Sequence, residues 1–361
     1  MLSLSKHEGA VRFERRLMPS SPGFLKYLLA AGFAALPLFA HAAEQRPFYA
    51  GKTLNLIVGE PPGGGSDTYA RLLARHIVRH ILGTPAIVVQ NMPGAGTLKS
   101  VIYLNTAAPS DGTVIATFSS ALIGQAVTMP QRVNVDFRNF TWIGNISEDV
   151  RVCYVWAASG VKTWPEMLAR SRTKEIFMGA TAPGTAGNAD TAMLQNLFGV
   201  KIRQVQGYAG SADKRLAVER REIDGDCGGW TSLPEDWLRD RKINVVVRLS
   251  PTLVPGMEAS VPFGGDLTKD ARERQLYDFL IAPERLGRLY MLSSKVPADR
   301  VAVLRAAFDK AVADPAFRAE AARMKLLVTP MNGAEVAGHV AALYAPPRDL
   351  IARAGTILGH Q

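Results

Sequence analysis

The sequence predicts an α/β protein of two doubly wound domains, preceded by an export signal. Short apolar runs, such as residues 53–58 and 113–118, alternate with helical patterns, and this alternation is typical of parallel sheets. Glycine-rich loops follow several of the runs. The 361 residues are enough for two domains, each with its own core.

The N-terminal region predicts a signal peptide. Residues 24–39 form an apolar run that ends in Ala40-His41-Ala42, a small-x-small pattern suited to signal peptidase. The run is too short for an ordinary membrane span. No cysteine precedes Cys153, so we expect no lipid anchor at the cleavage site. The polar region before the run is unusually long, and Met18 is an alternative start. We expect a periplasmic protein comprising residues 43–361.

The chain is basic, but the distribution of its basic residues argues against a nucleic-acid partner. The formal net charge is +10, and about +7 remains once residues 1–42 are removed. No block rich in lysine and arginine is interleaved with aromatic residues, as nucleic-acid binding would favour. A mild basic excess suits an anionic ligand or simple solubility.

The elements follow one another in a regular order. Expected strands cover residues 53–58, 86–90, 113–118, 142–144, 152–157, 176–179 and 244–249, with further strands near residues 204 and 227. Expected helices cover residues 69–82, 98–106, 164–170, 190–198, 212–220, 299–312, 315–323 and 334–343. We assign residues 43–149 to domain 1, residues 150–228 to domain 2, and residues 229–361 to a return to domain 1 with C-terminal helices. Crossings near residues 145–152 and 227–230 then form a two-segment hinge.

Three loops rich in Gly, Ser and Thr, at residues 63–67, 94–97 and 184–188, follow strands and open helices. Helix N-termini present unpaired N–H groups and partial positive charge, which suit carboxylates or phosphates. Each loop alone could be a tight turn, but their recurrence at the carboxyl ends of strands favours a ligand site. The candidate ligand contacts are Glu60, Gly63, Gly64, Gly65, Ser66, Ser119, Ser120, Thr181, Gly184, Thr185, Ala186, Asn188, Tyr208, Gly210 and Ser211. We assign Asp67 to helix capping.

The candidate loops at residues 60–67, 180–188 and 207–211 contain no Arg or Lys. We therefore expect backbone N–H groups and the hydroxyls of Ser66, Thr185 and Ser211 to hold an anion without a cation. Tyr208 would add an apolar wall with a polar tip.

Motifs for catalysis are weak. The first loop lacks the lysine of a P-loop and the last glycine of a dinucleotide fingerprint. Ser211-Ala-Asp-Lys214 matches the S-x-x-K pattern of penicillin-recognising enzymes, but companion motifs and a G-x-S-x-G elbow are missing. A serine hydrolase using Ser211 and Lys214 is the alternative function. His76 and His80 have a metal-binding spacing on a helix, but without a catalytic Glu between them we interpret them as surface residues. We expect no enzyme activity, no cofactor and no metal.

Cys153 and Cys227 are the two cysteines of the chain, and both fall near the predicted crossings. In an oxidising compartment an even pair predicts a disulfide. Two buried thiols are the alternative.

Several motifs occur in an order that is characteristic of one family. They are Leu56-Ile-Val58, Pro61-Pro-Gly-Gly-Gly-Ser-Asp67, Ala70-Arg71, Asn91-Met-Pro-Gly-Ala-Gly96, Ala108-Pro-Ser-Asp-Gly112, Gly207-Tyr-Ala-Gly-Ser211, Glu219-Arg-Arg-Glu-Ile-Asp-Gly225 and Val296-Pro-Ala-Asp-Arg300. Together they resemble the Bug proteins, the TctC-like substrate-binding receptors of tripartite tricarboxylate transporters, over essentially the whole chain after residue 42.

The resemblance implies a periplasmic binding protein fold of type II, with two domains joined by a hinge. It implies a solute-binding protein that captures a small organic solute, a carboxylate, in the interdomain cleft and delivers it to membrane permease subunits. A ligand-sensing arm of a signalling system is a further alternative. We expect a monomer. Glu60 departs from the family, which usually has an aromatic or small residue there, and a carboxylate would disfavour an acidic ligand group nearby.

We predict that the exported, mature protein begins at Ala43, because signal peptidase should cleave after Ala40-His41-Ala42. N-terminal sequencing of the protein recovered from the periplasm checks this. Recovery of protein that still carries residues 24–39 would contradict it.

Overall fold

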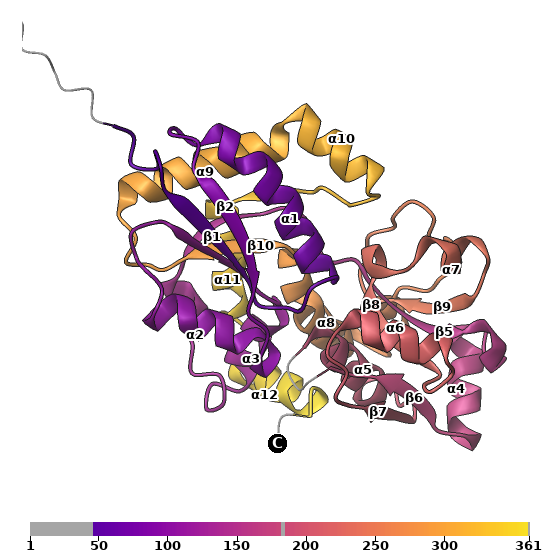
Figure 1. The fold of residues 1–361 in the computed structure, drawn as a ribbon. Coiled ribbons are helices and arrows are strands. Elements are labelled where there is room, and N and C mark those ends of the chain that lie inside the picture. Colours follow the sequence, from indigo (N-terminus) through magenta and orange to yellow (C-terminus); the bar gives the residue numbers. More distant parts are fainter. Residues whose placement is uncertain (1–45, 182–184, 360–361) are drawn as a thin grey trace, which may run out of the picture. The chain divides into compact units, whose positions relative to one another are not determined.

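The structure is a computed structural model that describes residues 46–181 and 185–359. The expected signal peptide and Gly184 lie outside the described residues. From Arg46 onward the chain forms one compact unit. Within its described part, the strands form a six-stranded and a five-stranded sheet (Figure 1). No helix in this part is long and apolar enough to cross a bilayer.

The six-stranded sheet is the centre of the first lobe. Its strand order is β11-β4-β10-β3-β1-β2, in which β1 pairs parallel with β2 and β3, while β10 runs antiparallel to β3 and β4. These strands are β1 (Thr53–Val58), β2 (Ala86–Asn91), β3 (Val114–Thr117), β4 (Thr141–Asn145), β10 (Leu289–Leu292) and β11 (Met331–Asn332). Strands β3 and β10 are buried at every residue, as expected of strands covered on both faces.

The five-stranded sheet is the centre of the second lobe. Its strand order is β7-β6-β8-β5-β9, with β6 parallel to β7 and β8, and β5 antiparallel to β8 and β9. The strands are β5 (Arg151–Trp156), β6 (Ile176–Gly179), β7 (Ile202–Val205), β8 (Gly225–Gly229) and β9 (Ile243–Arg248).

The helices connect these strands and cover the faces of both sheets. They are α1 (Gly65–Ile77), α2 (Leu98–Thr106), α3 (Ala121–Thr128), α4 (Trp164–Thr173), α5 (Ala186–Asn196), α6 (Ser211–Glu219), α7 (Glu235–Arg239), α8 (Ala271–Ile281), α9 (Ala298–Ala313), α10 (Pro315–Arg323), α11 (Gly333–Leu343) and α12 (Arg348–Ile357). Local signals fix several starts: Asp314 caps α10, and Asn332 with Glu335 forms a capping box on α11.

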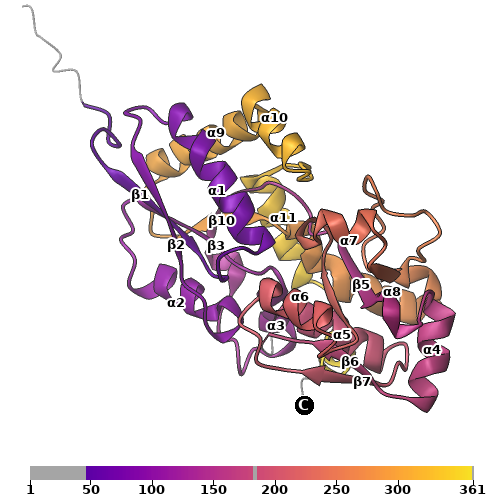
Figure 2. The same cartoon turned by 45° about the vertical axis from the view of Figure 1, so that its right-hand side comes forward.

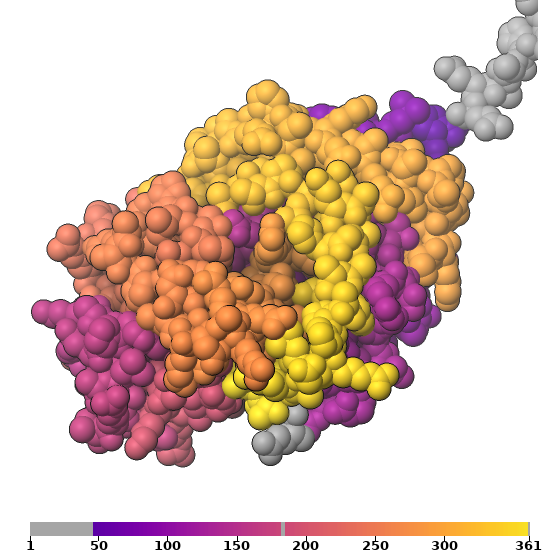
Figure 3. Space-filling model, turned by 180° about the vertical axis from the view of Figure 1, so that it is seen from behind, coloured from indigo at the N-terminus to yellow at the C-terminus, as the bar shows by residue number. Residues whose placement is uncertain are grey.

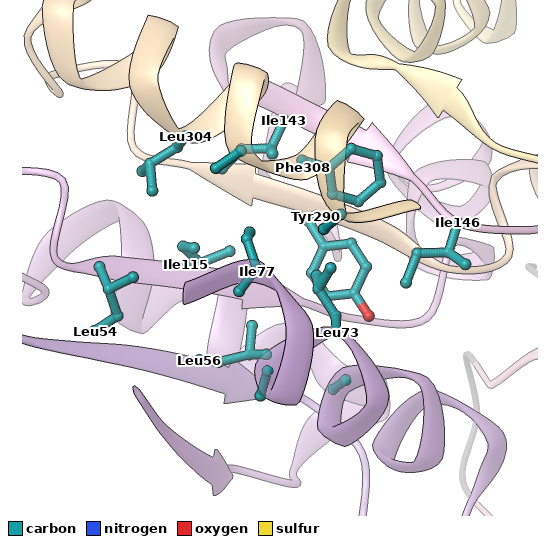
Figure 4. Close-up of a cluster of buried hydrophobic side chains, with 14 of the residues drawn as sticks. Leu54, Leu56, Leu73, Ile77, Ile115, Ile143, Ile146, Tyr290, Leu304 and Phe308 are labelled. Carbon is teal, nitrogen blue, oxygen red and sulfur yellow. The ribbon is translucent and has the colours of Figure 1, made fainter. Parts of the chain in front are cut away.

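One core of the first lobe lies between its sheet and helices α1 and α9. Figure 4 shows Leu73 and Ile77 of α1 and Leu304 of α9 approaching side chains of the strands. Phe308 of α9 lies directly over β4, where a Cβ on Gly144 would come within 2.1 Å of the ring. Glycine at position 144 is therefore required for this close helix–strand approach.

The chain crosses between the lobes twice. The first crossing joins β4 to β5, as expected from the sequence, and the second joins α8 to β10 through residues 282–288. Backbone hydrogen bonds tie the two crossings together, from Asp149 N–H to Glu284 O at 2.8 Å and from Ile146 N–H to Arg288 O at 3.0 Å. This pairing places both connections side by side.

The expected second crossing at residues 227–230 was wrong. Residues 225–229 are β8, inside the second sheet, and β9 also belongs to this sheet because it pairs with β5. The return to the first sheet comes at β10 rather than at residue 229. Figure 2 shows β5, α7 and α8 together in the second lobe, apart from β1 and β2. An apolar strand pattern does not specify which sheet the strand joins.

The C-terminal helix α12 contacts both lobes. It packs against α3 of the first lobe and against α5 and α8 of the second, and its Leu350 and Ala354 belong to a core cluster of the second lobe. Figure 3 shows the yellow C-terminal segment on this reverse side, next to the orange region that contains α8.

His76 and His80 bind carboxylates rather than forming a metal centre. His76 Nε2 lies 2.6 Å from Glu320 Oε2, and His80 Nε2 lies 3.2 Å from Asp314. His76 is buried, so the expectation of a surface position was wrong for this residue. The two contacts fasten α1 and its extension to α10. No cluster of three or more metal-ligating side chains occurs in residues 46–181 and 185–359.

Cys153 and Cys227 form a disulfide, as the sequence predicts. They face each other across β5 and β8, with Cα atoms 4.1 Å apart. The bridge joins the strand that enters the second lobe to the strand that ends at the cavity described below.

Removing the disulfide should lower the free energy of unfolding by about 4 kcal/mol, since the bridge closes a loop with a sequence separation of 74. Urea unfolding of the Cys153→Ala/Cys227→Ala double variant, compared with the oxidised wild type, measures the loss. Reductant should destabilise the wild type and leave the variant unchanged. Equal stability of oxidised and reduced wild type would contradict the prediction.

Candidate ligand-binding site

A cavity of about 250 Å³ lies where loops from the two lobes meet. The first lobe supplies residues 59–62 and 64–66 after β1 and residues 93–97 after β2. The second lobe supplies Thr181 and residues 185–187 after β6, and residues 208–211 after β7. The loops thus gather at the carboxyl ends of parallel strands, where open α/β sheets bind ligands.

Most of the candidate residues from the sequence lie around this cavity, and a few do not. Those that line it are Glu60, Gly64, Gly65, Ser66, Thr181, Thr185, Ala186, Tyr208, Gly210 and Ser211. Gly63, Ser119, Ser120 and Asn188 lie away from its lining. Ser119 and Ser120 are buried at the start of α3, and Asn188 donates to Gln204 Oε1 at 2.5 Å. The sequence predicted these residues as ligand contacts because, like the residues that line the cavity, they lie between a strand and a helix.

Asp67 holds the first loop in place, but the expectation that it caps the helix was wrong, because the N-cap of α1 is Gly64 and no side chain caps this helix. Its carboxylate accepts from the Gly63 N–H at 3.1 Å, from Arg71 Nε at 3.1 Å and from Asn91 Nδ2 at 3.0 Å. Burial alone would raise the pKa of Asp67, but these hydrogen bonds outweigh it and lower the pKa. Asn91 also donates to the backbone oxygen of Glu60 at 2.8 Å. Asp67 and Asn91 therefore fix the backbone of the loop after β1, which lines the cavity.

Three helices begin at the cavity: α1 at Gly65, α5 at Ala186 and α6 at Ser211. The residues before α1 and α6 are Gly64 and Gly210, which have no side chain to cap the first N–H groups. Those N–H groups, with the positive ends of the helix dipoles, remain available to a ligand with negative charge.

Three cations also line the cavity, which corrects the expectation of a site without them. They are Arg151 of β5, Lys214 of α6 and Arg288 just before β10. Arg151 and Arg288 lie outside the candidate loops as single basic residues, so no motif marked them. Lys214 matches the S-x-x-K pattern, which predicts a catalytic role rather than a ligand contact.

Each of these cations is paired with at least one carboxylate, and the two arginines share one of them. Arg288 NH2 lies 2.8 Å from Asp149 Oδ1, and Arg151 NH1 lies 3.0 Å from the other oxygen of Asp149. Arg151 Nε also donates to Asp190 at 2.6 Å. Lys214 Nζ lies 2.7 Å from Asp226.

Asp149 is the carboxylate shared between the lobes. Burial opposes its ionisation, but the attraction of Arg288 and Arg151 prevails and lowers the pKa of Asp149. The cavity therefore contains one ionised carboxylate that bridges two guanidinium groups.

Two buried donors at the cavity lack a partner in the described part of the chain. They are Nε of Arg288 and the hydroxyl of Thr97. Both residues are only 5% exposed. The Arg288 guanidinium lies 5.0 Å from the centre of the Tyr69 ring, and a Cβ on Gly65 would come within 2.8 Å of its NH2. An unpaired buried donor costs about 1–3 kcal/mol.

Glu60 brings a further carboxyl group to the cavity. Its side chain accepts a hydrogen bond from Ser66. Burial raises the pKa of Glu60, although Ser66, Arg288 and Arg151 each act in the opposite direction.

Known proteins of similar sequence cover about half of the chain. No protein-family model matches it. Over 191 residues it is 32% identical to protein BugT of Bordetella pertussis, covering 51% of this chain and 55% of BugT. Over 211 residues it is 26% identical to a UPF0065 protein of Agrobacterium vitis, covering 58% of each. The matched region thus spans a little over half the length of these curated relatives.

Similarity of structure extends further along the chain. The periplasmic binding protein BugD superposes with a TM-score of 0.71 at 17% identity, covering 87% of this chain and 99% of BugD. A TctC solute-binding protein from Polaromonas gives a TM-score of 0.58 at 21% identity, covering 84% and 99%. The chain is Bug/TctC-like. Its fold is that of the periplasmic binding proteins.

In this Bug/TctC-like chain, Asp149→Asn should lower the free energy of unfolding at pH 7 by about 3 kcal/mol, because it leaves buried guanidinium charge uncompensated. The folded pKa of Asp149 is depressed, so its contribution is present above the unfolded value of about 3.9 and is lost as pH falls through the folded value. The difference between wild type and variant should therefore shrink on acidification.

Urea unfolding from pH 7 to pH 3 measures this difference. Asp240→Asn is the control, since Asp240 pairs with the adjacent Arg239 on the surface. A difference between wild type and Asp149→Asn that stays constant across this range would contradict the assignment.

Proposed function

We propose that the protein is a periplasmic solute-binding receptor that captures a small organic carboxylate between its two lobes. One observation carries the proposal: four loops, two from each lobe, line a single cavity at the carboxyl ends of parallel strands. A solute bound there contacts both lobes, so it favours the arrangement in which they lie together.

The chemistry of the cavity supports an anionic group on the solute. Helices α1, α5 and α6 direct their N-terminal ends to it, and Arg288 Nε and the Thr97 hydroxyl are donors without a partner in the described residues. Two solved structures of the same fold contain carboxylates. They are MatC from Rhodopseudomonas palustris with malate (TM-score 0.67, 19% identity, covering 85% of this chain and 99% of MatC) and Rpa4515 from R. palustris with adipate (TM-score 0.69, 16% identity, covering 85% and 97%).

Delivery to the permease subunits of a tripartite tricarboxylate-type transporter follows from the resemblance to Bug proteins. We propose that the receptor acts as a monomer and that export places it in the periplasm. A ligand-sensing role would use the same cavity and the same closure, and it would differ in the membrane partner alone.

The alternative of a serine hydrolase is disfavoured by the position of Lys214. Ser211 and Lys214 both line the cavity, but the Lys214 ammonium is bound to Asp226 at 2.7 Å. A general base needs a free lone pair to take the serine proton. Loss of ester or amide turnover in Ser211→Ala, relative to an active wild type, would reverse this judgement.

The receptor should retain one organic acid per chain when purified under native conditions. Mass spectrometry of molecules released by denaturation identifies the acid, and calorimetry then measures its affinity. Arg288→Lys should weaken binding roughly 10- to 100-fold, because it keeps a positive charge beside Asp149 but removes the Nε–H donor.

Arg274→Lys is the matched control for Arg288→Lys, since Arg274 pairs with Asp278 on α8 away from the cavity. Full affinity in Arg288→Lys would contradict the anion site. Failure to detect any retained or added carboxylic acid would contradict the proposed function.

A further inference from the structure

We infer, on the basis of the proposed function, that Glu60 selects a solute that carries an ammonium group in addition to its carboxylate. Glu60 lines the cavity on the loop after β1, in the first lobe. Asn91 binds its backbone oxygen, and Asp67 fixes the loop behind it. The position of Glu60 is therefore set by the structure and does not depend on a bound solute.

Arg288 and Arg151 lie near enough to lower the pKa of Glu60, but the charges around the cavity in the described part of the chain leave Glu60 without an ion pair. Arg288 pairs with Asp149, and Lys214 pairs with Asp226. Arg151 pairs with Asp149, Asp190 and Glu284. Among the described residues no ion pair includes Glu60, whose carboxyl accepts a side-chain hydrogen bond from Ser66. A carboxylate has about four acceptor sites, so most of its capacity is unused.

The excess of carboxyl groups favours a cationic group on the solute. The three cations pair with four carboxyl groups, those of Asp149, Asp190, Glu284 and Asp226. Glu60 is a further acid that lines the cavity. A second carboxylate on the solute would meet Glu60 and Asp149 together, whereas an ammonium would give Glu60 the partner it lacks. The helix N-termini and the unpaired donors of Arg288 and Thr97 would hold the carboxylate of the same solute.

Because Glu60 must be ionised to bind an ammonium group, the inference predicts that solute affinity depends on pH. The groups that act on Glu60 are Ser66 of α1, Arg288 before β10, Asp149 in the first crossing and Arg151 of β5. Burial and Asp149 raise its pKa, and the other three lower it, with a net rise. The empty site therefore holds a proton to higher pH than an ordinary glutamate does. An ammonium requires the ionised form, so its binding releases this proton and tightens as pH rises through the pKa of Glu60.

Calorimetry with matched pairs of acids tests the inference. The pairs glutamate and glutarate, aspartate and succinate, and phenylalanine and 3-phenylpropionate differ by the ammonium group. In the pair whose size fits, the amino acid should bind wild type more tightly than its partner. Glu60→Gln should weaken the amino acid roughly 10- to 100-fold, and it should abolish the pH dependence.

Glu219→Gln is the control, since Glu219 is an exposed residue at the end of α6 and undergoes the same change of charge. Thermal unfolding of both variants shows that they remain folded. If an acid without an ammonium binds wild type more tightly, with affinity that falls as pH rises, Glu60 donates its proton to a carboxylate, and the inference is overturned while the proposed function stands. If no member of any pair binds wild type, the proposed carboxylate receptor itself fails.

Discussion

The structure depends on one carboxylate, Asp149, at the point where the chain passes between its lobes. Its two oxygens bind Arg151 of the second lobe and Arg288 at the second crossing, while its backbone N–H binds Glu284. Removing three charged groups from water is costly, so such a cluster contributes less to stability than to position. It holds the two crossings together and places two guanidinium groups beside the cavity, each already paired with a carboxylate.

The pairing of each cation with a carboxylate explains how a cavity with three cations can suit a small solute. A free buried arginine would attract any anion, including inorganic ones, whereas a paired arginine offers only its remaining N–H directions. Arg288 has NH1 and NH2 engaged by Gly287 and Asp149, and Nε is left. Selectivity then depends on the geometry of individual donors. The disulfide between β5 and β8 and the clamp of Asp67 on the first loop keep that geometry fixed from both lobes.

The sequence predicted the parts of the fold that local patterns encode. Alternating apolar runs and helices gave both lobes, and glycine loops after strands gave most of the cavity lining. A pair of cysteines near a crossing gave the disulfide. It did not predict that β9 stays in the second sheet, because an apolar strand can pair in either sheet until its neighbours are known. The sequence also did not predict that Arg151 and Arg288 line the cavity. A single arginine has no local signature, and only tertiary contacts bring each of them to the site.

Backbone donors and side chains have different roles in this site. Glycine loops at helix N-termini present N–H groups whatever the solute, so they provide a general anion site that relatives of the same fold can share. These loops cannot by themselves distinguish one organic acid from another, since their N–H groups contact the carboxylate that all such acids share. Discrimination must come from the side chains that face the rest of the solute, and Glu60 and Tyr208 are side chains of the cavity lining that can do so. Of these two, Glu60 is the acid, and the cations near it are already bound to other carboxylates. The proposed specificity therefore rests on a side chain, Glu60, rather than on the glycine loops that give the cavity its general affinity for anions.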